Sequence, residues 1–119
     1  MSTKKEIWAH WDRAWSLGLP AKERLSALQA ATSPNFRYVN PQVEVPGGNL
    51  EQLVQFIDQE MVQTGNKLTV KHIKWREHHD QSALQWEMID VETKASLLPG
   101  WSCAQYDAEG KLLSVADFF

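Results

Sequence analysis

The chain has 119 residues, of which 43% are hydrophobic and six are tryptophan. This length suits one compact domain over residues 1–119, and the apolar content is far above that of a disordered chain. Twelve basic and fifteen acidic residues give a net charge of −3, which does not favour nucleic acid as a partner. No apolar run reaches the length of a membrane span and no apolar leader follows Met1. We therefore expect a cytoplasmic protein with no membrane partner.

The first thirty residues predict two helices, because apolar side chains recur at spacings of three and four. Leu19-Pro20 separates them, and Pro20 suits the first turn of the second helix. Ser33-Pro34 is expected to end this helical pair. A strand over 36–40 and a short strand through Val43 and Val45 come next.

Asn49 is a good N-cap for a third helix, whose apolar stripe ends at Thr64-Gly65. From there the pattern favours strands to the end of the chain, at 67–77, 84–91, 95–106 and 111–119. Helices followed by a meander of long strands predict an α+β fold, in which a curved sheet wraps the helices.

The element order resembles a known family. Asn40-Pro41, the turn Pro46-Gly47-Gly48 before the third helix and the final hairpin from Ala104 to Phe119 are similar to the nuclear transport factor 2-like fold. The segments 78–81 and 85–87 are most similar to its SnoaL-like, polyketide cyclase-like members. The resemblance implies a cone-shaped half-barrel, also known as a cystatin-like roll, in which a mostly antiparallel sheet encloses a pocket. Isomerases, cyclases, hydrolases and binding proteins share this scaffold, so the reaction depends on the site.

Two activities of this fold fit the residues poorly. The ketosteroid isomerases of this fold place a carboxylate base where this chain has Asn40, and a protonated Asp where it has Ser102. Their helical tyrosine falls near Trp15 and Ser16, neither of which is a tyrosine. The limonene epoxide hydrolase pattern would need an Arg that 85–87 does not supply.

Asp117 is the carboxylate that the resemblance retains, since cyclases and hydrolases of this fold place an acid/base residue on the last strand. If Val115 and Phe119 face the core, the period of two places Asp117 on the same face. A carboxylate there would be desolvated, which would raise its pKa and suit acid/base catalysis. The alternative is that Asp117 bonds to nearby backbone or lies at a wet edge.

The same alternation predicts the rest of a ligand pocket. We expect the side chains of Leu84, Trp86, Ser102 and Asp117 to face one interior cavity. The predicted ligand-binding residues are Trp15, Tyr38, Asn40, Trp86, Met88, Ser102 and Phe119. Small residues at Gly100 and Ala104 are expected to leave room for the ligand. This lining suits an apolar or aromatic small molecule with one or two oxygens. Alternatively, the six tryptophans fill a small core.

The remaining reactive side chains predict little chemistry. An adjacent pair such as His78 and His79 rarely aims both rings at one ion, so we expect no metal and no cofactor. Either histidine could shuttle protons at the pocket mouth, or could bond to Asp80 within its turn. Cys103 is the only cysteine, so an internal disulfide is excluded and the residue is expected in the core.

Two functional interpretations stay open. In the first, Asp117 is the general acid/base of a cyclase- or isomerase-type enzyme acting on an apolar carbonyl compound, with Asn40 and Ser102 orienting the oxygen. In the second, the cavity binds a small apolar or aromatic molecule without chemistry. We also expect a homodimer, because Ile73 and Trp75 lie on a strand that is expected to place them on an exposed convex sheet face.

Overall fold

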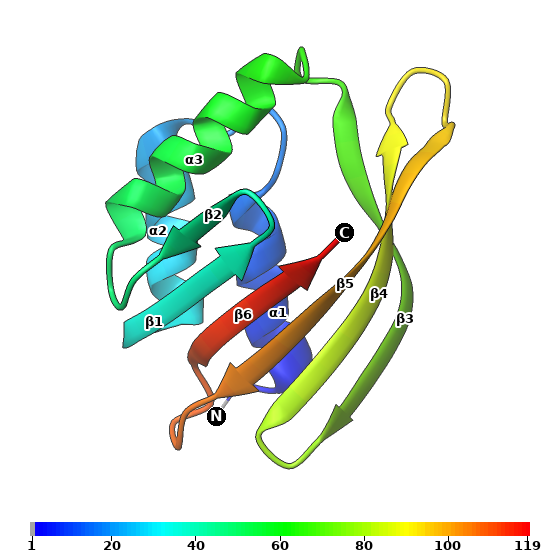
Figure 1. Ribbon diagram of the computed structural model, residues 1–119. Coiled ribbons are helices and arrows are strands. Elements are labelled where there is room, and N and C mark those ends of the chain that lie inside the picture. The colour runs from blue at the N-terminus through cyan, green and yellow to red at the C-terminus, as the bar shows by residue number, and fades with distance from the viewer. Residues whose placement is uncertain (1) are drawn as a thin grey trace.

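A computed structural model describes residues 2–119 as three helices and one sheet of six strands (Figure 1). The elements are α1 (Lys4–Ala14), α2 (Ala21–Ala31), β1 (Thr32–Asn40), β2 (Val43–Val45), α3 (Leu50–Gln63), β3 (Leu68–His78), β4 (Gln81–Asp90), β5 (Ser96–Tyr106) and β6 (Leu112–Phe118). No helix among the described residues is both long and apolar enough to cross a membrane.

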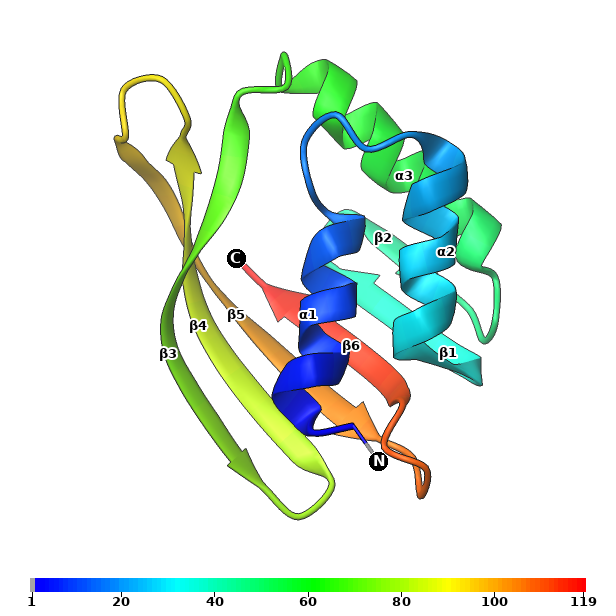
Figure 2. The ribbon, with the colours of Figure 1, turned by 180° about the vertical axis from the view of Figure 1, so that it is seen from behind.

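The strand order across the sheet is β2-β1-β6-β5-β4-β3. β1 and β6 pair in parallel, and every other neighbouring pair in this sheet is antiparallel. The long strands β3, β4 and β5 curve around the side on which α1 lies, so the sheet has a concave and a convex face (Figure 2). The predicted α+β class and the mostly antiparallel, open sheet are confirmed.

Local sequence explains where two of the helices begin. Thr3 Oγ1 accepts a hydrogen bond from the Glu6 amide at 3.1 Å, which caps α1. Asn49 Oδ1 does the same for the Gln52 amide at 3.2 Å, as the sequence predicts for α3. Pro20 differs from its predicted place: it is the N-cap of α2 rather than part of the first turn, and it offers no side-chain acceptor.

A buried arginine fastens the connection between α1 and α2. Arg24 is 2% exposed. Its guanidinium donates to the carbonyl oxygens of Ala14, Ser16 and Leu19, and its Nε lies 3.0 Å from Asp58 Oδ1 of α3. The guanidinium therefore has both hydrogen-bond acceptors and an ion-pair partner, as a buried cation requires.

The first strand begins earlier than the sequence predicts. β1 starts at Thr32, directly after α2, so Ser33-Pro34 lies inside the strand instead of in a separating loop. The pairing of β1 with β6 shifts register between Thr32 and Arg37. This irregular stretch contains Pro34, which has no amide to donate to a ladder.

A bulge in β3 changes which side chains face the helices. His72 pairs with Trp86 and Trp75 pairs with Leu84, with the register shifted between His72 and Lys74. An extra residue reverses the alternation of faces, so His72 and Trp75 both turn to the concave side. There Trp75 packs edge-to-face on Trp8 of α1, with ring centroids 6.0 Å apart. The expectation that Trp75 lies on the convex face is therefore wrong.

The convex face carries a different set of apolar residues. Trp101 and Phe118 are neighbours in register on β5 and β6, and they are 46% and 57% exposed. Cys103 is also exposed, which corrects its predicted place in the core. The alternation that turns Ser102 inward turns Cys103 outward.

Candidate functional site

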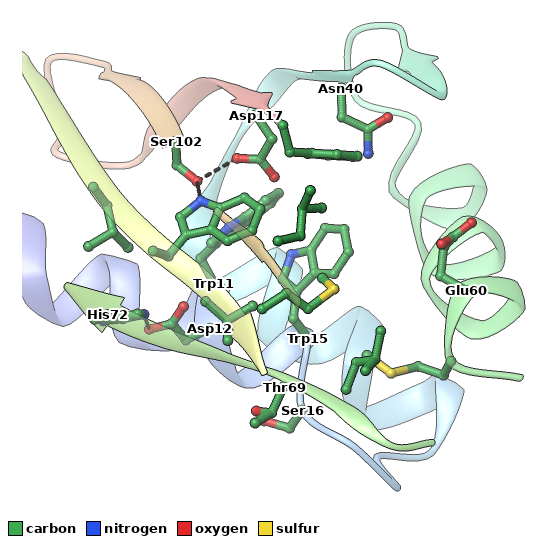
Figure 3. A pocket seen from close by; sticks show the side chains of 18 of the residues that line it. Trp11, Asp12, Trp15, Ser16, Asn40, Glu60, Thr69, His72, Ser102 and Asp117 are labelled. Atoms are coloured by element: carbon green, nitrogen blue, oxygen red, sulfur yellow. Dashed lines mark hydrogen bonds and ion pairs between the residues drawn. The ribbon is translucent and has the colours of Figure 1, made fainter. Parts of the chain in front are cut away.

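A cavity of about 540 Å³ lies between the concave sheet face and helices α1 and α3 (Figure 3). Small-molecule pockets commonly have this size. All eight predicted site residues lie on its wall, namely Trp15, Tyr38, Asn40, Trp86, Met88, Ser102, Asp117 and Phe119, and Leu84 lines it as well. Among residues 2–119 its lining includes the acidic Asp12, Glu60 and Asp117 but no lysine or arginine.

Aromatic rings form most of the wall beside α1. Trp11 lies 5.9 Å from Trp15 and 5.5 Å from Tyr38, measured between ring centroids, and Trp15 lies 5.7 Å from Tyr38. On the sheet side, Trp86 and Phe119 are 6.1 Å apart. These tilted contacts are typical of packed aromatic clusters. The surface that they present to a ligand is apolar and rigid.

Asp117 is held by two hydroxyl groups. Ser102 Oγ donates to Asp117 Oδ1 at 2.5 Å, and Tyr38 Oη donates to Oδ2 at 2.6 Å. Ser102 and Asp117 are direct partners in the β5–β6 ladder, and Tyr38 pairs with Val115 across β1 and β6. Three adjacent strands therefore aim these groups at one point. Each carboxylate oxygen keeps further lone-pair capacity for a ligand.

Trp86 and Asn40 donate to Ser102 and Tyr38, and these two contacts set the direction of the hydrogen bonds in the network. Trp86 Nε1 donates to Ser102 Oγ at 3.0 Å. Asn40 Oδ1 accepts from the backbone amides of Gln42 and Val43, which orients the amide group so that its Nδ2 donates to Tyr38 Oη at 3.0 Å. Both hydroxyl oxygens are therefore already accepting, and their protons are free to point at Asp117.

Burial and the hydrogen bonds shift the pKa of Asp117 in opposite directions. Burial raises the pKa of its carboxyl group above the ordinary value, while the hydrogen bonds from Ser102 and Tyr38 lower it less strongly. This is the direction expected from the sequence. Burial, together with the nearby Asp117 charge, raises the pKa of Tyr38 well above its ordinary value. Tyr38 therefore stays protonated and remains a donor.

Asn40 and Ser102 were expected to orient a substrate oxygen, and both make hydrogen bonds within the protein. Ser102 Oγ bonds to Trp86 and Asp117, while Asn40 donates to Tyr38 and accepts from two backbone amides. The predicted space above Gly100 is also filled. A Cβ added to Gly100 would stand 2.2 Å from the Trp86 ring, so the glycine admits the indole instead of a ligand.

A second polar pair lines the cavity wall and was not predicted. His72 Nε2 lies 3.0 Å from Asp12 Oδ2, which joins β3 to α1. The hydrogen bond to Asp12 raises the pKa of His72. The expected outward placement of Ile73 implies that His72 faces inward, and Asp12 lies four residues after Trp8 on α1. The sequence therefore contained both residues of this pair, but nothing in it showed that they meet.

His78 and His79 do not take part in this site. They lie exposed in the β3–β4 turn, with their Nδ1 atoms 3.2 Å apart, and neither lines the cavity. The alternative of a proton shuttle at the pocket mouth therefore has no support from the positions of these two residues. Asp80 interacts with Gln105 instead, at 3.5 Å, which also corrects the predicted bond within the turn.

Comparison with solved structures shows the nuclear transport factor 2-like fold. A proposed isomerase of the SnoaL-like family from Agrobacterium tumefaciens superposes with a TM-score of 0.82, with 18% identity over 99% of this chain and 97% of the other. A proposed polyketide cyclase from Sinorhizobium meliloti gives 0.69 with 8% identity, over 94% and 93%. A de novo designed protein of this fold gives 0.69 with 11% identity, over 100% and 87%. No family model and no curated protein matches the sequence.

Proposed function

We propose that this protein is an acid/base enzyme of the cyclase or isomerase type that acts on a small apolar carbonyl compound. The observation that carries the proposal is Asp117: a carboxylate with a raised pKa, on the wall of an aromatic cavity, with both oxygens positioned by hydroxyl groups. A base whose pKa lies closer to neutrality is better matched to proton transfer at physiological pH. The similarity to SnoaL-like structures is consistent with this reaction class.

The reaction begins with Asp117 in its ionised form. The carboxylate takes a proton from the carbon next to the carbonyl group, and the C–H electron pair forms the enolate double bond while the carbonyl π pair moves to oxygen. Asp117 then returns the proton, to the same carbon or to another. Ser102 and Tyr38 stabilise the carboxylate between turnovers and keep it in one orientation.

The second candidate is a binding protein without chemistry. One observation favours it: the hydroxyl donors of the network point at Asp117 and not at the cavity. In that case the network stabilises a buried charge, and the aromatic wall alone binds the ligand.

Deuterium exchange separates these two functions without a known substrate. A panel of apolar ketones is incubated with the protein in D₂O, and exchange of the protons next to the carbonyl is followed by NMR. We expect catalysed exchange that Asp117→Asn lowers by roughly 10²-fold or more. Asp80→Asn, in the exposed β3–β4 turn, is the control and should keep the activity. Binding of a ketone with no exchange, in both the parent chain and Asp117→Asn, would leave the binding function ahead.

We also propose that two copies pair through their convex faces. The patch around Trp101 and Phe118 is apolar, and β5 contains no charged residue while β6 contains only the inward-facing Asp117. A second copy presents the same uncharged patch, so two patches can meet without opposing like charges within the patch, despite the net charge of −3.

A further inference from the structure

Trp15 has a hydrogen-bond donor that the fold leaves unused. Its Nε1 is buried and has no acceptor, although the residue lines the cavity. The contrast with Trp86 is direct, because the Trp86 Nε1 donates to Ser102 on the same cavity wall. Buried indole N–H groups normally have a partner, and an unpaired one costs free energy.

The position of this donor points to a ligand. Trp15 is the C-cap of α1, and its ring packs against Tyr38, whose hydroxyl donates to Asp117. Trp15 and Asp117 are thus both neighbours of one tyrosine ring. Figure 3 shows the Trp15 indole reaching from the helix side toward the cavity, while Asp117 reaches in from the sheet side.

The other unpaired indoles fit a ligand less well. Trp75 does not line this cavity. Trp8 also lines the cavity, but it packs edge-to-face on Trp75 at 6.0 Å, an arrangement in which a ring N–H can meet the neighbouring π face. The contacts of Trp15 with Trp11 and Tyr38 are tilted instead. Ser33 Oγ, the remaining unpaired donor, does not line the cavity. Among the unpaired buried donors of residues 2–119, Trp15 is therefore the one best placed to donate to a ligand atom.

We propose that the Trp15 N–H donates to the carbonyl oxygen of the ligand while Asp117 faces the carbon next to it. This inference rests on the proposed function and specifies its substrate class: an uncharged, apolar, enolisable ketone or aldehyde. A carboxylate-bearing ligand is disfavoured, since the cavity wall carries Asp12, Glu60 and Asp117 and no lysine or arginine among the described residues. His72, which also lines the wall, is already paired with Asp12. When Asp117 takes the proton, negative charge develops on the oxygen, and the Trp15 hydrogen bond strengthens.

Matched probes test the donor separately from the ring. 2-Acetylnaphthalene carries a carbonyl group, whereas 2-ethylnaphthalene has nearly the same shape without it. Binding of both is measured by calorimetry to the parent chain, to Trp15→Phe, and to Trp101→Phe as a control on the convex face. We expect Trp15→Phe to weaken the ketone by about tenfold and the hydrocarbon by less than about twofold. Trp101→Phe should change neither affinity.

The outcomes separate this inference from the function on which it rests. Equal weakening of both probes, or of neither, would overturn the role of the Trp15 N–H and leave the proposed function standing. If neither probe binds the parent chain and no ketone of the exchange panel binds or exchanges, both proposals fall. Thermal unfolding of Trp15→Phe verifies that the variant is folded. If it is not, Trp15→His, which restores a ring N–H, must recover the preference for the ketone over the hydrocarbon, and its failure to do so also overturns the inference.

Discussion

The concave and convex faces of the β5–β6 pair reverse the usual distribution of residues. Ser102 and Asp117 form one register pair, and they face the cavity. The adjacent pair, Trp101 and Phe118, faces outward and is about half exposed. Antiparallel sheets with one solvated face normally place apolar residues inside and polar residues outside.

The reversal has a separate physical reason on each face. Inside, the polar groups are tolerated because each is hydrogen-bonded, from Trp86 through Ser102 to Asp117. Outside, two large aromatic side chains remain exposed to water, which monomeric surfaces seldom present as a contiguous patch. The inner pair therefore lines the cavity of the proposed site, and the outer pair lies on the face that we propose for pairing of two copies.

Substitution of two tryptophans on neighbouring strands should reveal the difference between the two faces with the largest effect. Trp86 is 5% exposed and Trp101 is 46% exposed. We expect Trp86→Ala to lower the free energy of unfolding by about 3–5 kcal/mol, because it opens a cavity and leaves Ser102 without its donor. Trp101→Ala should cost less than about 1 kcal/mol in the monomer. Urea unfolding at low protein concentration measures both, and equal losses would contradict the comparison.

A charge introduced on the convex face is expected to disrupt the pairing of two copies without changing the cavity. Trp101→Glu should weaken self-association by at least about tenfold, because two copies would bring like charges together at the contact. Sedimentation over a range of concentrations measures the dissociation constant. Glu92→Gln, in the exposed β4–β5 turn, is the control. A parent chain that stays monomeric at high concentration would refute the dimer.

The pH dependence of stability gives the smallest effect. Because burial raises the pKa of folded Asp117, the folded chain binds that proton more tightly than the unfolded chain. Stability is therefore lost as pH rises from the unfolded value of about 3.9 through the raised folded pKa. Asp117→Asn cannot ionise, so its stability relative to the parent chain should improve across this window.

Urea unfolding at a series of pH values follows this difference. The raised pKa of His72 contributes to both chains and cancels in the comparison. Parallel stability profiles for the parent chain and Asp117→Asn would mean that the carboxyl group does not change its pKa on folding.

Local patterns in the sequence determined the types and order of the elements. The spacing of apolar residues and the Asn49 cap located the helices, and strict alternation placed Trp86, Ser102 and Asp117 on one face. These features depend on near neighbours along the chain, which a single sequence displays. The acid on the last strand could therefore be singled out before the structure.

Contacts between distant segments decided the rest. The bulge at Ile73 turned Trp75 inward, which no alternating pattern predicts, and the packing of α1 against β3 placed Asp12 beside His72. The partners of Asn40 and Tyr38 depend on how β1 lies parallel to β6, at the opposite end of the chain. The direction of the hydrogen bonds to Asp117 and the unpaired N–H of Trp15 depend on how several strands and helices pack together. Only the tertiary structure could therefore assign them.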